Sequence, residues 1–391
     1  MQSKTRWLTV AALLFAGVIV ALQIGKAVIA VPVLQKELAL SLTFASWIIG
    51  AYGVIGAIGG LPMGIAVSLF RARTALIVGL IACGLGSLAG ALAGNGAMLI
   101  ASRIVEGCGF LIAVIAIPRL LRTVIAARDS DTVLAFWGAY MPAGSLIMML
   151  GGPYLMTFGW QAMWIVNGVV VLAYALVMLA FDFSEPPAIP NTAKQTAANI
   201  RAVLGAPGPV LLAVLFGLYT FQYAAMVGLL PVLLVDRLGL SIAAAGAVAA
   251  LTVAANALGN LSASAMMRFR VPFWAIAAGG FAFAGGAGFG VFSDALPVTV
   301  IAALAAASLA LTGMIPASIF AAAPKFSPGP AVLAIAFGLI TQASNIGNLI
   351  GPAAMAAVVD SFGWDRAPYL FAAVTAAGFA MSLLLRAFLK K

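Results

Sequence analysis

The sequence predicts an all-helical integral membrane protein built from two similar halves. Of the 391 residues, 64% are apolar and 8% are charged, whereas about 25% of the residues of a water-soluble globular protein are charged. Apolar runs of about 20 residues, long enough to cross the hydrocarbon core of a bilayer, recur between short polar turns. Because a spanning segment in lipid must satisfy its own backbone hydrogen bonds, we expect these runs to be α-helices.

A stretch that occurs twice indicates the two halves. Residues 23–41 and 222–241 both contain Gln, then eight residues, then Pro-Val-Leu, and finally Leu-x-Leu-Ser after a short charged turn. Gly152-Pro153 and Gly351-Pro352 repeat at nearly the same offset. Matches spread along both halves favour duplication of a whole unit over a chance motif.

Twelve membrane-spanning helices are expected, each an apolar run bounded by a polar turn. Those of the first half are expected at residues 7–34, 43–69, 74–93, 97–120, 132–156 and 161–182. Those of the second half are expected at residues 209–235, 242–267, 272–292, 297–321, 330–359 and 367–388. The stretch between the halves is polar and contains proline. The predicted domains are therefore a six-helix bundle at 1–182, a cytoplasmic linker at 183–208 and a second six-helix bundle at 209–391.

The basic residues predict the orientation. Six helices in each half make the two repeats parallel, since both enter the membrane from the same side. With the N-terminus inside, fifteen basic residues fall on the cytoplasmic side: Lys4, Arg6, Arg71, Arg73, Arg119, Arg122, Arg128, Lys194, Arg201, Arg268, Arg270, Lys325, Arg386, Lys390 and Lys391. The remaining turns carry only Lys36, Arg237 and Arg366. The positive-inside rule then predicts a multi-pass plasma-membrane protein with both termini cytoplasmic.

This arrangement resembles the major facilitator superfamily over the whole chain. The helix 4 signature of that family, Arg-x-x-x-Gly-x-Gly, is intact at residues 103–109. The signature between helices 2 and 3 is degenerate, because Gly64 and Arg73 match while Ser68 replaces its acid. The resemblance implies a secondary transporter, not an enzyme, whose two halves rock around a central site.

The repeated Gly-Pro pair has two interpretations. The pair at the end of helix 5, Gly152-Pro153, is similar to a motif of proton-antiporting members of the family. Helix 11 carries Gly351-Pro352 at the equivalent place. Since proline removes a helical hydrogen bond and glycine permits close approach, a symmetric structural bend is favoured, and an antiport marker remains the alternative.

Three charges fall within predicted helices, namely Lys26, Arg103 and Glu106. Each costs roughly 2.5 to 3.5 kcal/mol at membrane depth unless it has a partner or faces water. Arg103 and Glu106 are three residues apart, so they lie on one helix face and are expected to pair. Glu106 is the one acid placed inside the membrane and the chain has no histidine, which makes Glu106 the candidate for carrying a coupling proton.

Lys26 has no acid in its own helix, and its counterpart in the second repeat is Ala225. An uncompensated ammonium favours a positively charged cavity and an anionic substrate. Alternatively, Lys26 extends to the lipid headgroups at the outer end of its helix.

Polar side chains at helical spacing supply further candidates for contact with the substrate. The substrate-binding candidates are Gln23, Lys26, Arg103, Tyr219, Gln222, Tyr223, Asn256, Gln342 and Asn345. The tryptophans near predicted helix ends are expected to anchor the protein at the membrane interface. These are Trp7, Trp160, Trp164, Trp274 and Trp364.

We therefore expect a secondary active transporter of a small organic or inorganic anion, working as a monomer in the lipid bilayer by alternating access. The alternative is proton-coupled efflux of drugs or metabolites. The sequence has no phosphate-binding Gly-x-x-x-x-Gly-Lys-Ser/Thr loop, so an ion gradient is the expected energy source. No nucleic acid is expected as a partner, because the basic residues are spread singly over many turns. No cofactor is expected, and no metal either, because the chain has no histidine and one acid within the predicted helices.

Overall fold

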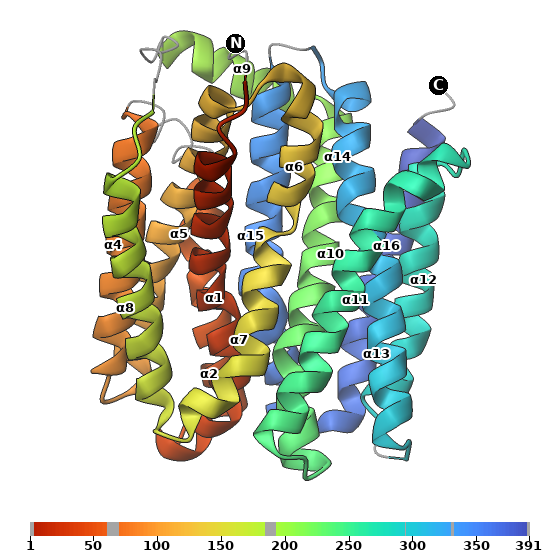
Figure 1. Ribbon diagram of the computed structural model, residues 1–391. Helices are drawn as coiled ribbons and strands as arrows, with labels where there is room; N and C mark the ends of the chain where they lie inside the picture. Colours follow the sequence, from red (N-terminus) through yellow and green to blue (C-terminus); the bar gives the residue numbers. More distant parts are fainter. Residues whose placement is uncertain (1–3, 61–69, 184–192, 294, 330–331, 389–391) are drawn as a thin grey trace.

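The computed structural model describes residues 4–60, 70–183, 193–293, 295–329 and 332–388, and within these ranges it contains helices and no strands (Figure 1). The elements up to residue 183 are α1 (Trp7–Glu37), α2 (Leu42–Gly50), η1 (Ala51–Gly53), α4 (Ala72–Ala91), α5 (Gly96–Val124), η2 (Ala127–Asp129), α6 (Ser130–Gly138), α7 (Tyr140–Met156) and α8 (Trp160–Leu179). The later elements are α9 (Ala193–Leu204), α10 (Pro207–Val232), η3 (Leu233–Arg237), α11 (Ile242–Arg268), α12 (Phe273–Val291), α13 (Val298–Thr312), α14 (Met314–Phe326), α15 (Leu333–Phe362), η5 (Trp364–Arg366) and α16 (Ala367–Phe388). The all-helical membrane fold is confirmed.

Ten helices in the described part of the chain are long and apolar enough to cross a membrane. They correspond to ten of the twelve predicted spans. The predicted span 132–156 is divided at Ala139 into α6 and α7, and the span 330–359 corresponds to α15, a helix of 30 residues. Both segments are helical, and their crossing of the membrane remains a prediction.

The two chain ends lie at the same end of the molecule, which we call the terminal end; the other is the opposite end (Figure 1). The predicted linker contains a short helix, α9, which lies across the terminal end. The division into bundles at 1–182 and 209–391 remains a prediction.

Close helix pairs occur at equivalent places in the two repeats. In the first half α1 packs on α7, and in the second half α10 packs on α15. A Cβ atom added at Gly25 would lie 2.5 Å from the carbonyl oxygen of Ser145, and one added at Gly351 would overlap the carbonyl oxygen of Phe221. Small residues at these positions therefore let the paired backbones touch.

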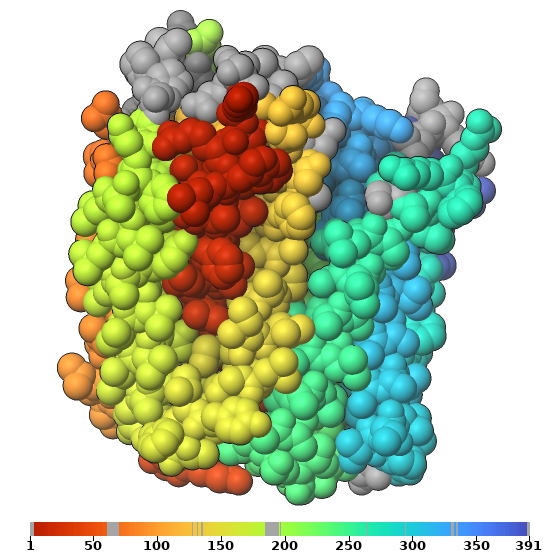
Figure 2. All heavy atoms as spheres, in the orientation of Figure 1, coloured from red at the N-terminus to blue at the C-terminus, as the bar shows by residue number. Residues whose placement is uncertain are grey.

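The two halves meet along a seam formed by α2 against α15 and by α7 against α11. Figure 2 shows α7 (yellow) and α11 (green) in contact in the lower part of the molecule as drawn. At the opposite end one apolar cluster joins both halves, with Val28 and Met149 from the first and Leu229 from the second. Toward the terminal end the apolar clusters are separate. The members of one cluster all lie between residues 10 and 183, and those of another lie between residues 212 and 385. Among the described residues, the buried core is thus shared between the two halves at the opposite end.

Two polar contacts also join the halves at the opposite end. Asp360 accepts hydrogen bonds from the backbone N–H of Thr43 at 2.8 Å and from its hydroxyl at 2.6 Å. Lys36 Nζ lies 3.6 Å from a carboxylate oxygen of Asp236. Because Thr43 is in the first turn of α2, a carboxylate of the second half caps a helix of the first.

Replacing Asp360 with alanine removes this cap. We expect the closed arrangement of the opposite end to lose about 1 kcal/mol, which is roughly a fivefold change in the ratio of closed to open molecules. Double electron–electron resonance between spin labels at positions 37 and 361, where Glu37 and Ser361 are both exposed at this end, should show longer distances in the Asp360→Ala variant than in the wild-type protein. Asp360→Asn, which keeps an acceptor oxygen, is the matched control and should shift the distances less. An unchanged distance distribution for Asp360→Ala would contradict the capping role.

Candidate functional site

The three charges that the sequence places within helices meet inside the first half. Lys26 Nζ lies 2.8 Å from Glu106 Oε1, and Arg103 binds the other carboxylate oxygen of the same residue. All three side chains are at most 1% exposed. The predicted pairing of Arg103 with Glu106 is confirmed, and a second ion pair with Lys26 is added to it.

The helix 4 signature explains how this charged cluster is held between α1, α2 and α4. Arg103 and Glu106 are three residues apart on α5 and so share one face. A Cβ atom at Gly107 would overlap the carbonyl oxygen of Tyr52, and one at Gly109 would overlap the backbone of α4 at Cys83. The two signature glycines therefore let η1 and α4 lie directly against α5.

Lys26 has two further neighbours, from α4 and α8. Its ammonium donates to Ser87 Oγ at 2.6 Å and lies 4.7 Å from the centre of the Trp164 ring. The Ser87 hydroxyl in turn donates to the backbone carbonyl of Trp164 at 2.7 Å. The ammonium is thus enclosed by a carboxylate, a hydroxyl and an aromatic face, each of which favours a cation.

Arg103 connects the cluster to α2 and η1. Its Nε donates to the carbonyl of Ile48 at 3.1 Å, and its guanidinium lies 4.6 Å from the centre of the Tyr52 ring. The Tyr52 hydroxyl donates to the carbonyl of Val20 on α1 at 3.1 Å. One charged cluster therefore links five elements of the first half: α1, the segment of α2 and η1, α4, α5 and α8.

Three sequence-based interpretations need correction. Lys26 is not without a counter-charge, because α5 supplies Glu106, and it does not extend to the headgroups, because it is fully buried. Trp160 and Trp164 are 1% and 0% exposed, so they are core residues and not interface anchors. Ser87 was missed, although it is a polar residue within the apolar span 74–93 and that isolation is a signal.

A second polar group lies in the second half and does not contact the charged cluster. Tyr219 and Asn256 are hydrogen-bonded to each other, with the amide nitrogen of Asn256 donating to the Tyr219 hydroxyl at 3.1 Å. The same amide donates to the carbonyl of Leu309 on α13 at 3.0 Å. The ring of Tyr219 stacks between those of Phe216 and Tyr223, with centroids 5.7 and 6.0 Å away.

Two of the predicted amides lie in the seam between α15 and the helical residues 54–60 that follow η1. Gln342 donates to the carbonyl of Ala57 at 3.0 Å. Asn345 donates to the carbonyl of Thr341 at 3.0 Å, and its amide lies against Gly56, where a Cβ atom would be 2.5 Å away. In this structure both side chains serve contact between helices.

Gln23 and Gln222 occupy equivalent places on α1 and α10 and are both fully buried. Neither the amide nitrogen nor the amide oxygen of either residue has a hydrogen-bond partner in the described part of the protein. Leaving a buried polar group unpaired costs about 1 to 3 kcal/mol. These four atoms are therefore available to a ligand or to water.

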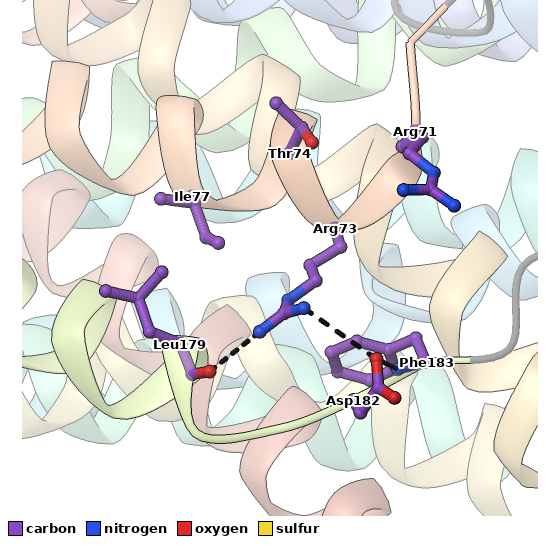
Figure 3. Close-up of a pocket in the computed structure, with 7 residues that line it drawn as sticks. All are labelled: Arg71, Arg73, Thr74, Ile77, Leu179, Asp182 and Phe183. Carbon is purple, nitrogen blue, oxygen red and sulfur yellow. Dashed lines mark hydrogen bonds and ion pairs between the residues drawn. The ribbon is translucent and has the colours of Figure 1, made fainter.

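The degenerate signature between helices 2 and 3 is described only in part, since Gly64 and Ser68 lie outside the described residues. At the start of α4, Arg73 donates to the carbonyl of Leu179 at 2.7 Å and lies 3.7 Å from the carboxylate of Asp182 (Figure 3). Arg71 lies on the rim of the same pocket, of about 350 Å³. Asp182, three residues after the end of α8, therefore forms an ion pair with Arg73 of this signature.

The repeated Gly-Pro pairs lie in continuous helices. Pro153 lies within α7 and faces α11, since a Cβ atom at Gly246 would be 3.3 Å from its ring. Pro352 lies within α15 and faces α10, with the equivalent distance to Gly228 at 3.5 Å. Each proline thus packs against a glycine of a neighbouring helix, and a role in antiport stays a prediction.

Comparison with known families decides the identity. The profile described as Major Facilitator Superfamily matches residues 13–329. The chain belongs to the Major Facilitator Superfamily. The predicted family is confirmed.

Several relatives of the chain are named as resistance proteins. The chain is 26% identical to the lincomycin resistance protein of Streptomyces lincolnensis over 52% of its own length and 44% of that protein. It is 28% identical to the methylenomycin A resistance protein of Bacillus subtilis over 39% of this chain and 33% of the relative. The corresponding match to the tetracenomycin C resistance and export protein of Streptomyces glaucescens is 29% over 44% and 33%. The matches thus span less than half the length of these relatives.

Solved structures of the superfamily share the fold. A bacterial homologue of the human lysosomal transporter Spinster, in an inward-facing and occupied conformation, superposes with a TM-score of 0.76 at 12% identity, over 98% of this chain and 94% of the other. A D-xylose–proton symporter superposes with a TM-score of 0.74 at 16% identity, over 96% of both chains.

Glu106→Gln should leave two buried cations without a carboxylate. We expect it to lower the free energy of unfolding by about 3 to 5 kcal/mol, measured by denaturant unfolding of the protein in detergent. Adding Lys26→Met removes one of the stranded cations and should recover part of this loss. A double variant no more stable than Glu106→Gln alone would contradict the charge pairing.

Proposed function

We propose that this transporter exports an apolar or cationic organic compound across the plasma membrane in exchange for protons, with both chain termini in the cytoplasm. The observation that carries the proposal is the partner of Lys26. The expectation of an anionic substrate depended on an ammonium without a counter-charge, and Glu106 supplies that counter-charge inside the first half.

Aromatic rings in both halves support an apolar cargo. In the first half the rings of Trp137 and Tyr140 stack at 4.2 Å, and Phe110 lies 4.8 Å from Tyr52. In the second half Phe216, Tyr219 and Tyr223 form the stack described above. Aromatic faces bind flat apolar groups and organic cations. We assign these two groups of rings to the substrate route.

The unpaired amides of Gln23 and Gln222 would provide its polar contacts. They come from α1 and α10, which pack against each other across the two halves. Each amide can both donate and accept, so the pair suits a compound with a few polar groups in an apolar frame. The separate apolar clusters toward the terminal end support entry of the substrate from that side.

The relatives named for resistance to lincomycin, methylenomycin A and tetracenomycin C support export as the direction. Anion transport is the second candidate, because the buried cluster holds two cations and one carboxylate. This excess of positive charge is the observation in its favour.

The proposal is tested by expressing the chain in a drug-sensitive bacterium and measuring growth with lincomycin or methyl viologen. We expect the inhibitory concentration of at least one compound to rise severalfold, and everted vesicles to accumulate it when a proton gradient is applied. The double variant Gln23→Ala, Gln222→Ala should lose this effect, whereas Gln161→Ala, at an exposed position, should keep it. Saturable counterflow of benzoate or phosphate, with no effect on either drug, would overturn drug export and favour anion transport.

A further inference from the structure

The buried cluster of Lys26, Arg103 and Glu106 carries a net charge of +1 when all three groups are ionised. A net charge at this depth costs several kcal/mol, and arginine does not lose its proton in proteins. Releasing a proton from Lys26 makes the cluster neutral. Adding a proton to Glu106 instead would raise the net charge of the cluster to +2. The charge balance therefore favours Lys26 over Glu106 as the group that exchanges a proton.

The hydrogen bonds point to the same residue. Both carboxylate oxygens of Glu106 already accept from cations, one from Lys26 and one from Arg103. If either Glu106 oxygen were protonated, its O–H would need a hydrogen-bond acceptor, but the group beside it is a donor, Lys26 or Arg103. The ammonium of Lys26, in contrast, has three hydrogens and donates to two acceptors, Glu106 and Ser87. A neutral amine keeps two hydrogens, so both bonds survive and only the attraction to the Trp164 ring weakens.

Among the described residues, the helices around Lys26 present no carboxylate to it besides Glu106. The titratable or charged groups that face Lys26 are Glu106 and Arg103 on α5 and Cys83 on α4, and Tyr52 on η1 faces Arg103. Lys26 meets Trp164 from α8, and α7 presents Ser145 and Met148 to the neighbouring Gly25. Among the helices that pack against α1, α7 carries Tyr140 and α10 carries Tyr219 and Tyr223, and on α8 the hydroxyl of Tyr174 donates to the backbone carbonyl of Ala12 on α1.

A polar side chain for onward transfer lies one turn along α1. Gln23 is three residues before Lys26, so the two lie toward the same side of the helix. The amide oxygen of Gln23 has no donor within the described residues. It can therefore hold a water molecule that takes the proton from Lys26 and passes it toward the seam.

The second half has no equivalent group. Ala225 stands at the place of Lys26, and the buried charged side chains of the described chain all belong to the cluster in the first half. This asymmetry favours the exchange of one proton in each transport cycle.

We propose that Lys26 is the proton carrier of this transporter, cycling between ammonium and neutral amine while Glu106 stays ionised beside Arg103. In the release step the N–H bond breaks, its electron pair stays on Nζ and the proton passes to water. In the uptake step the lone pair of Nζ binds a proton from water on the other side of the membrane. This assignment rests on the proposed exchange of substrate for protons.

The direct test is nitrogen NMR of the full chain in nanodiscs, labelled with ¹⁵N at the lysine side chains. The Lys26 signal is identified by its absence from Lys26→Arg or, if that variant does not fold, from Lys26→Met. We expect this signal to change between ammonium and amine when methyl viologen is added or the pH is stepped through the range in which the protein transports. An ammonium signal under all these conditions would overturn the proposal.

Transport gives an independent test, because arginine keeps the positive charge but cannot release a proton. Proton-driven accumulation of the exported probe should fall at least tenfold in Lys26→Arg. It should be unchanged in Lys325→Arg, at an exposed position at the end of α14. Full proton-driven accumulation by Lys26→Arg would overturn the assignment and leave the proposed function in place. If the wild-type chain exports no drug but the Lys26 signal still changes, the proposed function fails and the assignment of the proton to Lys26 is supported.

Discussion

Charges buried among apolar helices need counter-charges, and in this protein that requirement determines how the first half is packed. Glu106 lies between Lys26 and Arg103, so α1 and α5 are held at the distance of an ion pair. The hydroxyl of Ser87 and the face of Trp164 bring α4 and α8 to the same point. The glycines of the helix 4 signature make this possible, because any side chain at Gly107 would displace η1.

The duplication makes the packing of the two halves symmetric, whereas the charged cluster is present in the first half alone among the described residues. Helix pairs repeat between the halves, so α1 with α7 corresponds to α10 with α15, and the two contacts of the seam are likewise equivalent. Such symmetry suits two bundles that rock against each other. The charged cluster breaks that symmetry, since the second half has Ala225 where the first has Lys26. A symmetric scaffold with a titratable group on one side is a simple way to couple the movement of both halves to one ion.

Sequence reasoning predicted what depends on local spacing and composition. Apolar length predicted the spanning helices, and a separation of three residues predicted the pair of Arg103 and Glu106. It did not predict the partner of Lys26, because Glu106 is 80 positions away and the contact depends on how α1 packs on α5. The burial of Trp164 was missed for the same reason: a residue near a helix end faces lipid or core according to its neighbours. The substrate residues remain proposals, since Gln342 and Asn345 show that an amide in a helix can equally serve packing.

The pairing of Lys26 with Glu106 must persist when the protein changes conformation. An experimental density map of the chain in nanodiscs, with the opposite end open, would measure this directly. We expect Lys26 Nζ to stay within hydrogen-bonding distance of Glu106 and Ser87, as it is here. A lysine that has moved away from Glu106, with Glu106 bound to Arg103 alone, would contradict the ion pairing and restore the argument for an anionic substrate.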